Sequence, residues 1–187
     1  NNAKKMKELN ALLAPLGFEV IPQGQLGIPE AEEPHCTFVE NALAKARHAA
    51  AHSGLPALAD DSGLCVEALH GAPGVLSARY AGDPKSDARN NEKLLTHLKE
   101  HTNRKAHFYC VLVLVRAAHD PQPIIAEGEW PGKILPEQQG EGGFGYDPLF
   151  FVPEFGQTAA EMDSETKNRV SHRGRAMQKL IERLPSL

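Results

Sequence analysis

Two adjacent carboxylates, Asp60 and Asp61, stand between two short apolar runs and are followed by Ser62 and Gly63. Carboxylate oxygens are the hard ligands that Mg²⁺ takes in proteins, usually one or two of them together with water and substrate phosphates. Because neighbouring negative charges repel each other, a bound cation would stabilise the pair. All four residues are also common turn formers, so a plain turn is the alternative interpretation of this stretch.

Glu40 is the natural partner of these carboxylates in a metal site. It occupies the third helical position after Thr37, which is the capping-box pattern and predicts a helix from Thr37 to Ala51. A glutamate in that position also caps its helix without any metal. The two roles are compatible, because both need a carboxylate at the helix N-terminus. On local grounds Lys45, farther along the same helix, is an exposed residue.

A glycine-rich stretch from Gly140 to Asp147 is the second candidate for chemistry. Four glycines in six residues allow the backbone to approach a flat or charged ligand closely. Phe144 and Tyr146, held between glycines, offer a stacking surface for a base. The alternative is a flexible hairpin loop with half-buried aromatic side chains. The stretch matches neither the P-loop nor the dinucleotide-binding glycine pattern.

Side chains that suit an anionic substrate are scattered along the chain. Lys4 and Lys5 stand at the start of the first predicted helix, where backbone N–H groups already favour an anion. The alternative there is a solvated, fraying terminus. Three further residues complete the polar set: Lys167, His172 and Arg173.

One pattern points to a different chemistry. His97-Leu-Lys-Glu100-His101 spells the H-x-x-E-H motif, so a zinc peptidase is an alternative function. That motif needs a third ligand on a following helix, whereas the residues after His101 lead into a predicted strand. His48 and His52 also lack a third partner in the sequence, and an exposed helix face is the simpler interpretation.

Composition limits the class of protein. The 187 residues carry 41% apolar and 24% charged side chains with a net charge of -4, which excludes a disordered tail, a fibre and binding to a long nucleic-acid backbone. The longest apolar run, Phe108 to Val115, is too short to span a bilayer. Three separated cysteines without a CxxC pair indicate neither a zinc site nor a disulfide framework, and they favour a reducing compartment. No signal-type apolar segment opens the chain, and we expect a short N-terminal element to precede it.

The spacing of apolar and turn residues predicts the elements that position these side chains. Helices are expected over 6–16, 37–51, 86–101 and 171–184, the first closed by Gly17 and the last capped by Ser171. Strands are expected over 18–21, 56–59, 64–69, 108–115 and 149–152, with a hairpin-like pair over 123–130 and 132–135 that breaks at Pro131. Interleaved helices and strands predict one α/β domain over 1–187 with a mixed sheet.

In their order along the chain, the motifs resemble the inosine triphosphate pyrophosphatase family, whose members hydrolyse deaminated purine nucleoside triphosphates. The resemblance runs nearly end to end. It rests on these segments: Asn2-x-x-Lys5-x-x-Glu8-Leu9, Thr37-Phe-Val-Glu40-Asn41-Ala, Lys45-Ala-Arg47, Ala59-Asp60-Asp61-Ser62-Gly63-Leu64, Gly71-Ala-Pro-Gly74, Ser77-Ala-Arg79-Tyr80, Gly142-Gly-Phe-Gly-Tyr-Asp147-Pro148 and Ser171-His172-Arg173.

The resemblance implies a Mg²⁺-dependent attack of water on the α-phosphorus, giving a nucleoside monophosphate and pyrophosphate. Asp61 would be the general base and a metal ligand, Glu40 the second ligand, and Asp60 a neighbouring catalytic residue. The triphosphate would lie against Asn1, Asn2, Ala3, Lys4, Lys5, Lys45, Ser62 and Arg173. The base and sugar would lie against Phe144, Gly145, Tyr146, Asp147, Lys167, His172 and Arg173, with Phe144 stacked on the base.

The fold implied by the resemblance is an elongated mixed sheet in two lobes with the site in the cleft between them. Members of the family usually form a cytoplasmic homodimer, and they place a strand and a Ser or Thr before the position of Asn2. The alternative function is a nucleotide-binding module without catalysis. The acidic pair argues against that alternative, because a binding protein gains little from a set of metal ligands.

Overall fold

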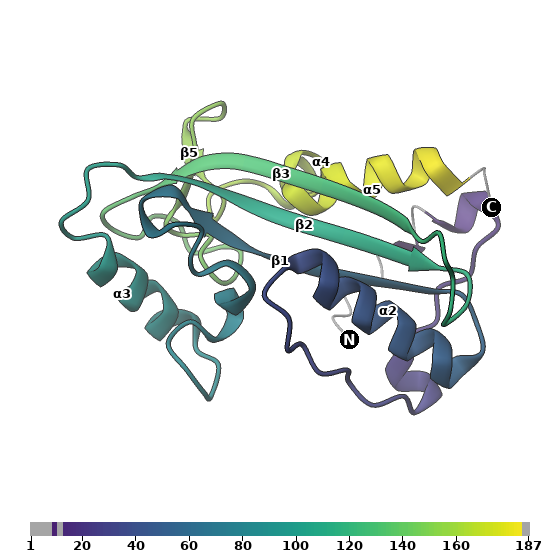
Figure 1. Ribbon diagram of the computed structural model, residues 1–187. Coiled ribbons are helices and arrows are strands. Elements are labelled where there is room, and N and C mark those ends of the chain that lie inside the picture. The colour runs from purple at the N-terminus through teal and green to yellow at the C-terminus, as the bar shows by residue number, and fades with distance from the viewer. Residues whose placement is uncertain (1–8, 11–12, 185–187) are drawn as a thin grey trace.

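The computed structural model describes residues 9–10 and 13–184 of the chain. Within them, five strands form one sheet in the order β1-β2-β3-β4-β5, and three long strands follow the length of the molecule (Figure 1). The strands are β1 (Ala57–Val66), β2 (Lys105–Val115), β3 (Ile124–Ile134), β4 (Phe150–Val152) and β5 (Gln157–Thr158). The α-helices are α2 (Phe38–Ser53), α3 (Asp87–His97), α4 (Ser164–Val170) and α5 (His172–Arg183). The 3-10 helices are η1 (Ala14–Leu16), η2 (Gln23–Leu26), η3 (Glu67–Leu69) and η4 (Gly74–Arg79).

The predicted α/β class, an elongated sheet flanked by helices, is confirmed. The pairing differs in one respect from the expected mixed sheet. Every strand pairing within the described residues is antiparallel, because each strand follows its neighbour directly in the sheet.

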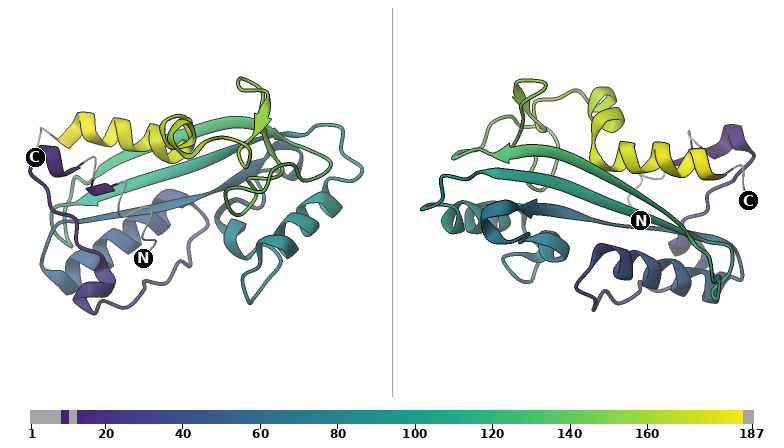
Figure 2. Two further views of the ribbon diagram at one scale, coloured as in Figure 1. Left: turned by 180° about the vertical axis from the view of Figure 1, so that it is seen from behind. Right: turned by 45° about the horizontal axis from the view of Figure 1, so that its top comes forward.

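The apolar sequence of β2 reflects burial on both of its faces, as predicted. Alternate side chains of a strand point to opposite faces of the sheet. One face of β2 packs against alanines of α2, and this core includes Val111, Val113, Val115, Ala42, Ala46 and Ala50. The other face packs against α5, and this core includes Cys110, Leu112, Ala176, Met177 and Leu180. Helices α2 and α5 therefore cover opposite faces of the sheet (Figure 2).

A separate core lies at the other end of the long strands. There β1, β2 and β3 pack with α3 and β4, and the buried side chains include Leu64, Phe108, Trp130, Leu94, Leu98 and Phe150. The long strands thus run through two packed regions, as two lobes require (Figure 1). Residues Asp60 to Gly63, in the middle of β1, belong to neither core, so polar side chains are tolerated there.

The turn interpretation of Asp60 to Gly63 is wrong, because β1 continues through these residues. The pairing runs from Asp60 opposite Leu112 to Gly63 opposite Tyr109 without a break. Pairing with a long central strand outweighs the weak turn preference of single residues.

Two other strand predictions also fail. β3 continues through Pro131, where the outer neighbour β4 pairs only with Lys133 and Ile134 and no ladder hydrogen bond is needed on that edge. Residues 18–21 form no strand. The backbone N–H of Val20 is instead bonded to the side-chain oxygen of Asn10.

The predicted helices after residue 36 are confirmed, together with the caps predicted at Thr37 and Ser171. Thr37, Ser86 and Ser171 each accept a backbone N–H of the first turn at the start of α2, α3 and α5. α3 ends at His97 rather than at His101. The helix predicted over 6–16 lies mostly outside the described residues, and Gly17 with a φ of 84° closes η1 at its described end. No helix in the described part of the chain is long and apolar enough to cross a membrane.

The free edge of β3 is covered by cationic side chains of α5. Three of them donate to successive outward carbonyls of β3: Arg175 to Glu129 at 3.1 Å, Lys179 to Glu127 at 2.8 Å and Arg183 to Ile125 at 2.6 Å. The spacings of donors and acceptors agree, because four residues of a helix and two residues of a strand both span about 6–7 Å. The occupied carbonyls protect this edge from pairing with another strand.

A prediction about stability follows from the contact between β3 and α5. A Cβ atom at Gly128 would lie 1.9 Å from the backbone oxygen of His172 and 2.6 Å from the backbone nitrogen of Ala176. Gly128→Ala should therefore push α5 off the sheet and lower the free energy of unfolding by about 2–3 kcal/mol, measured by chemical denaturation. Glu129→Ala, on the opposite face, is the control and should change stability by less than about 0.5 kcal/mol. Wild-type stability of Gly128→Ala would contradict this packing.

Candidate active site

The strand geometry of β1 separates the two adjacent carboxylates. Asp61 faces α2, where its oxygens lie 3.2 Å from Nζ of Lys45 and 3.4 Å from Nδ2 of Asn41. Asp60 faces α5, where its Oδ2 lies 3.1 Å from Nη2 of Arg173. The expectation that the two carboxylates share one cation is therefore wrong, because successive side chains of a strand point to opposite faces.

Burial and charge act against each other at Asp61 and Lys45. The Asp61 side chain is only 12% exposed, and burial raises the pKa of its carboxyl more than the nearby ammonium lowers it. Burial alone would lower the pKa of Lys45, but its hydrogen bond to Glu33 and the charge of Asp61 outweigh burial and raise the pKa. Lys45 is thus a fixed cation beside a partly desolvated carboxylate. The interpretation of Lys45 as an ordinary exposed residue is wrong.

Glu40 lies in the first turn of α2, over the same face of β1. The side chain of Thr37 accepts its backbone N–H at 3.3 Å and donates its hydroxyl to the Glu40 carboxylate, so the capping interaction is formed. Asn41, the next residue, reaches Asp61 and ties this turn of the helix to β1. The carboxylate oxygens that Glu40 and Asp61 carry are of the ligand type that Mg²⁺ accepts. Within the described residues, no group of three or more His, Cys, Asp or Glu side chains could hold a metal.

The start of α5 supplies the polar groups on the opposite face. Nη2 of Arg173 lies 3.3 Å from Oγ of Ser62, in addition to its contact with Asp60. The ring of His172 stacks on Phe108, with centroids 5.0 Å apart and planes inclined by 16°. The structure thus brings Asp60, Ser62 and Arg173 together across more than a hundred residues of sequence.

The glycine-rich loop is held in place by the side chain of Asp147. This carboxylate accepts the backbone N–H of Phe144 at 2.8 Å and forms an ion pair with Lys167. Gly143 has a φ of 76°, and a Cβ there would lie 2.3 Å from Oδ2 of Asp147, so only glycine fits. The interpretation as a flexible hairpin is therefore wrong.

Phe144 is presented to solvent, whereas Tyr146 is not. The Phe144 ring is 63% exposed, and the ammonium of Lys167 lies 5.1 Å from its centroid. Tyr146 is buried, and its hydroxyl donates to the backbone oxygen of Ser77 at 2.7 Å. A stacking role is thus available to Phe144 but not to Tyr146, because the tyrosine ring belongs to a buried core cluster.

Sequence reasoning missed the residues that clamp Gly145. Its N–H donates to Oδ2 of Asp87 at 2.7 Å, and its carbonyl accepts from Nδ2 of Asn91 at 2.9 Å. Both partners lie on the first turns of α3, more than fifty residues away in sequence. Their polar character on an amphipathic helix gave no indication of this role.

The predicted phosphate-binding residues at the start of the chain cannot be placed, whereas the histidine pattern at the end of α3 can. Asn1, Asn2, Ala3, Lys4 and Lys5 lie outside the described residues, and their role stays a prediction. The H-x-x-E-H pattern straddles the end of α3, and the ring of its first histidine, His97, forms a hydrogen bond with the hydroxyl of Tyr80 at 2.7 Å.

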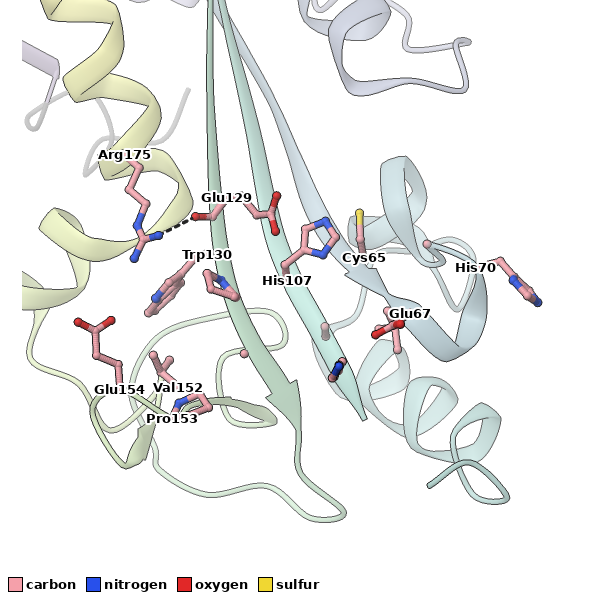
Figure 3. Close-up of a pocket in the computed structure, with 16 residues that line it drawn as sticks. Cys65, Glu67, His70, His107, Glu129, Trp130, Val152, Pro153, Glu154 and Arg175 are labelled. Carbon is pink, nitrogen blue, oxygen red and sulfur yellow. Dashed lines mark hydrogen bonds between the residues drawn. The ribbon is translucent and has the colours of Figure 1, made fainter. Parts of the chain in front are cut away.

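A cavity of about 770 Å³ opens elsewhere, lined by residues of β1, β2, β3 and β4. Cys65, His107, Trp130, Glu154 and Arg175 line it, and Figure 3 shows Arg175 bonded to the backbone of Glu129. None of the predicted site residues lines this cavity. It reaches β1 only at Cys65 and Val66 and does not include Asp60, Asp61 or Ser62.

Known proteins are similar to this chain in sequence and in fold. Residues 1–183 match the Ham1 family. The chain is 67% identical over 184 residues to a dITP/XTP pyrophosphatase of Aromatoleum aromaticum, covering 98% of the chain and 93% of that protein. A dITP/XTP pyrophosphatase of Nitrosomonas europaea is 61% identical over 184 residues, with 98% and 91% covered. The structure of a HAM1 protein from Coxiella burnetii matches with a TM-score of 0.97 at 48% identity, covering 100% of this chain and 96% of that one. The resemblance predicted from the motifs is confirmed, and the chain belongs to the Ham1 family.

Proposed function

We propose that the protein hydrolyses deaminated purine nucleoside triphosphates, namely ITP, dITP and XTP, to the monophosphate and pyrophosphate, and so keeps them out of DNA and RNA. The relatives named dITP/XTP pyrophosphatase support the substrate class. The observation that carries the proposal is the carboxylate of Asp61, held between Asn41 and Lys45 in the middle of β1. A partly desolvated carboxylate beside a cation suits the activation of water next to a phosphate.

In this proposal the side chains around β1 have two roles: one accepts a proton, and the others bind the negatively charged triphosphate. Asp61 takes the proton of the water that attacks the α-phosphorus. A triphosphate carries roughly four negative charges, which Lys45, Ser62 and Arg173 bind together with residues 1–5. A protein with a net charge of -4 can bind this anion, because neutralisation is local.

The proposed cofactor is Mg²⁺, held by Asp61 and Glu40. The ion would neutralise phosphate charge and make the attacking water more acidic. Asn41 and Lys45 would orient the Asp61 carboxylate, since both contact it in the structure. Asp60 is proposed to fix Arg173 from the opposite face rather than to bind the same ion.

Base selection is proposed to depend on the 6-oxo group of hypoxanthine and xanthine. Donors at His172 and Arg173 would bond to that oxygen, whereas adenine would place an amine against them. A buried mismatch of this kind discriminates by about 10⁴ or more. Asp147 and Lys167 hold the loop from which Phe144 would stack on the base.

The test is a product assay with purified protein and Mg²⁺ on ITP, XTP, GTP and ATP. We expect pyrophosphate release from ITP and XTP well above that from ATP. Release of orthophosphate alone from every nucleotide would refute the reaction. Tight binding of ITP without any release would favour the non-catalytic module instead.

Removing the exposed ring should affect binding rather than chemistry. Base stacking contributes about 1–3 kcal/mol, so Phe144→Ala should raise KM for ITP by about tenfold or more. The melting temperature should not change, because the ring is largely exposed. Phe144→Tyr keeps the aromatic face and should retain a near-normal KM. An unchanged KM in Phe144→Ala would remove the stacking role.

Two broader expectations belong to the same proposal. A homodimer is expected from the family, and sedimentation analysis would test it. A cytoplasmic location is consistent with the cysteines, since no disulfide is formed at Cys36, Cys65 or Cys110. Localisation of a tagged chain would test it.

A further inference from the structure

The backbone of Phe144 and Gly145 is held from two sides. The N–H and the carbonyl group of both residues are hydrogen-bonded. Asp147, within the loop, accepts the N–H of Phe144 at 2.8 Å and donates its own N–H to the Phe144 carbonyl at 3.2 Å. The groups of Gly145 are bound by α3: Oδ2 of Asp87 accepts the N–H at 2.7 Å, and Nδ2 of Asn91 donates to the carbonyl at 2.9 Å. Half of these hydrogen bonds therefore come from an element outside the loop.

The side chain of Phe144 does little to fix its own position. Its ring is largely exposed and belongs to none of the three buried cores, and its described contact is with the ammonium of Lys167. The residues on either side, Gly143 and Gly145, have φ values of 76° and 62°. Glycine also populates negative φ readily, so neither residue holds this conformation by itself. The direction of the ring is therefore set by the hydrogen bonds of the flanking peptide groups.

Helix α3 is suited to be a fixed support for the loop. Its N-terminus is capped by the side chain of Ser86, and Leu94 is buried in the core that also contains Tyr146. Asn91 is itself buried, and its Nδ2 also donates to the backbone oxygen of Asp87 at 2.9 Å. Residues four positions apart lie on one face of a helix, so Asp87 and Asn91 reach the loop together. The clamp on the loop is thus part of a helix that is packed into the core.

We propose that Asp87 and Asn91 are positioning residues for the purine base: by fixing Gly145 they hold Phe144 in the orientation in which it stacks on the base. The inference rests on the proposed function for the identity of the base and for the stacking role of Phe144. A loop that is already ordered loses less conformational entropy when a ligand binds, so the clamp raises affinity. The effect is on binding of the base and not on proton transfer at Asp61.

The test compares two ligands in the Asp61→Asn background, in which ITP should bind without being hydrolysed. Calorimetric titration with ITP reports on the base and the phosphates together, and titration with inorganic tripolyphosphate reports on the phosphates alone. Asp87→Ala should weaken ITP binding about 3–10-fold and leave tripolyphosphate binding unchanged. Asp87→Asn keeps an acceptor oxygen for the Gly145 N–H and should retain most of the affinity for ITP. Glu92→Ala removes the same charge from an exposed position of α3 and is the matched control, with unchanged affinity expected.

A double variant separates positioning of the ring from a general structural role. In the Phe144→Ala background, Asp87→Ala should change ITP affinity by less than about twofold, because the clamp acts through the ring that has been removed. Asn91→Ala removes the other half of the clamp and should weaken ITP binding in the same way, with the melting temperature as the check on folding. Unchanged ITP affinity in Asp87→Ala, an equal loss for tripolyphosphate, or an equal loss without the ring would overturn the inference.

The outcomes separate this inference from the proposed function. In the chain with Asp61 intact, Asp87→Ala should raise KM for ITP about 3–10-fold and change kcat by less than about twofold. Normal pyrophosphate release with an unchanged KM would refute the inference alone. The expected shifts in ITP affinity, in a protein that releases no pyrophosphate, would support the inference and refute the function.

Discussion

Asp61→Asn should lower pyrophosphate release from ITP by at least about 10³-fold, because it removes both the proton acceptor and one of the two carboxylates proposed to hold Mg²⁺. Asparagine has nearly the same size, and its one amide oxygen can still accept from Lys45, so only the weaker 3.4 Å contact with Asn41 loses its acceptor. The fold should therefore be retained, and the melting temperature is the check. Steady-state rates at saturating Mg²⁺ give the measurement.

Asp60→Asn is the matched control for that experiment. It makes the same chemical change one residue away, on the opposite face of β1, where the carboxylate contacts Arg173. We expect a loss of only about tenfold, since Arg173 would be less well oriented but the proton acceptor would remain. Equal losses in the two variants would mean that the two faces of the strand do not differ in function. Normal activity in Asp61→Asn would remove the proposed base.

Lys167→Met should destabilise the protein by about 3 kcal/mol. The side chains of Lys167 and Asp147 are 17% and 5% exposed, so removing the lysine leaves a buried carboxylate without its counter-charge. The loop that carries Phe144 should loosen as well, because Asp147 accepts the Phe144 N–H. Chemical denaturation gives the free energy of unfolding, and KM for ITP reports on the loop.

Two companion variants make the result of Lys167→Met specific. Arg169→Met lies on the same helix, α4, but is exposed, and it should change stability by less than about 0.5 kcal/mol. Adding Asp147→Asn to Lys167→Met removes the unpaired charge and should recover part of the lost stability. A single Lys167→Met variant as stable as the wild type would show that this ion pair does not hold the loop.

Local patterns predicted α2, α3 and α5 but not α4, and they were insufficient for the strands. The N-caps of α2 and α5 could be predicted because each capping side chain accepts a backbone N–H only three residues away. The turn expected at Asp60 to Gly63 and the break expected at Pro131 were wrong for one reason. Both stretches are held as strands by pairing with β2, a partner about fifty and twenty-five residues away.

The candidate site shows the same limit. The sequence identified Asp61, Lys45, Phe144 and Arg173 by their motifs, but not which faces they occupy. Period-two alternation places Asp60 and Asp61 apart only once the strand is known. The contact of Glu33 with Arg79 spans 46 residues, and the clamp of Asp87 on Gly145 spans 58. Such contacts depend on the packing of η4 and α3 and could not be predicted from the sequence alone.

Hydrolysis of ITP in ¹⁸O-labelled water tests most directly whether the groups around Asp61 direct water to the α-phosphorus. The reaction would be run with Mg²⁺ and both products analysed by mass spectrometry. We predict one ¹⁸O atom in the inosine monophosphate and none in the pyrophosphate. Label in released pyrophosphate or orthophosphate, with unlabelled monophosphate or diphosphate, would contradict attack at that phosphorus.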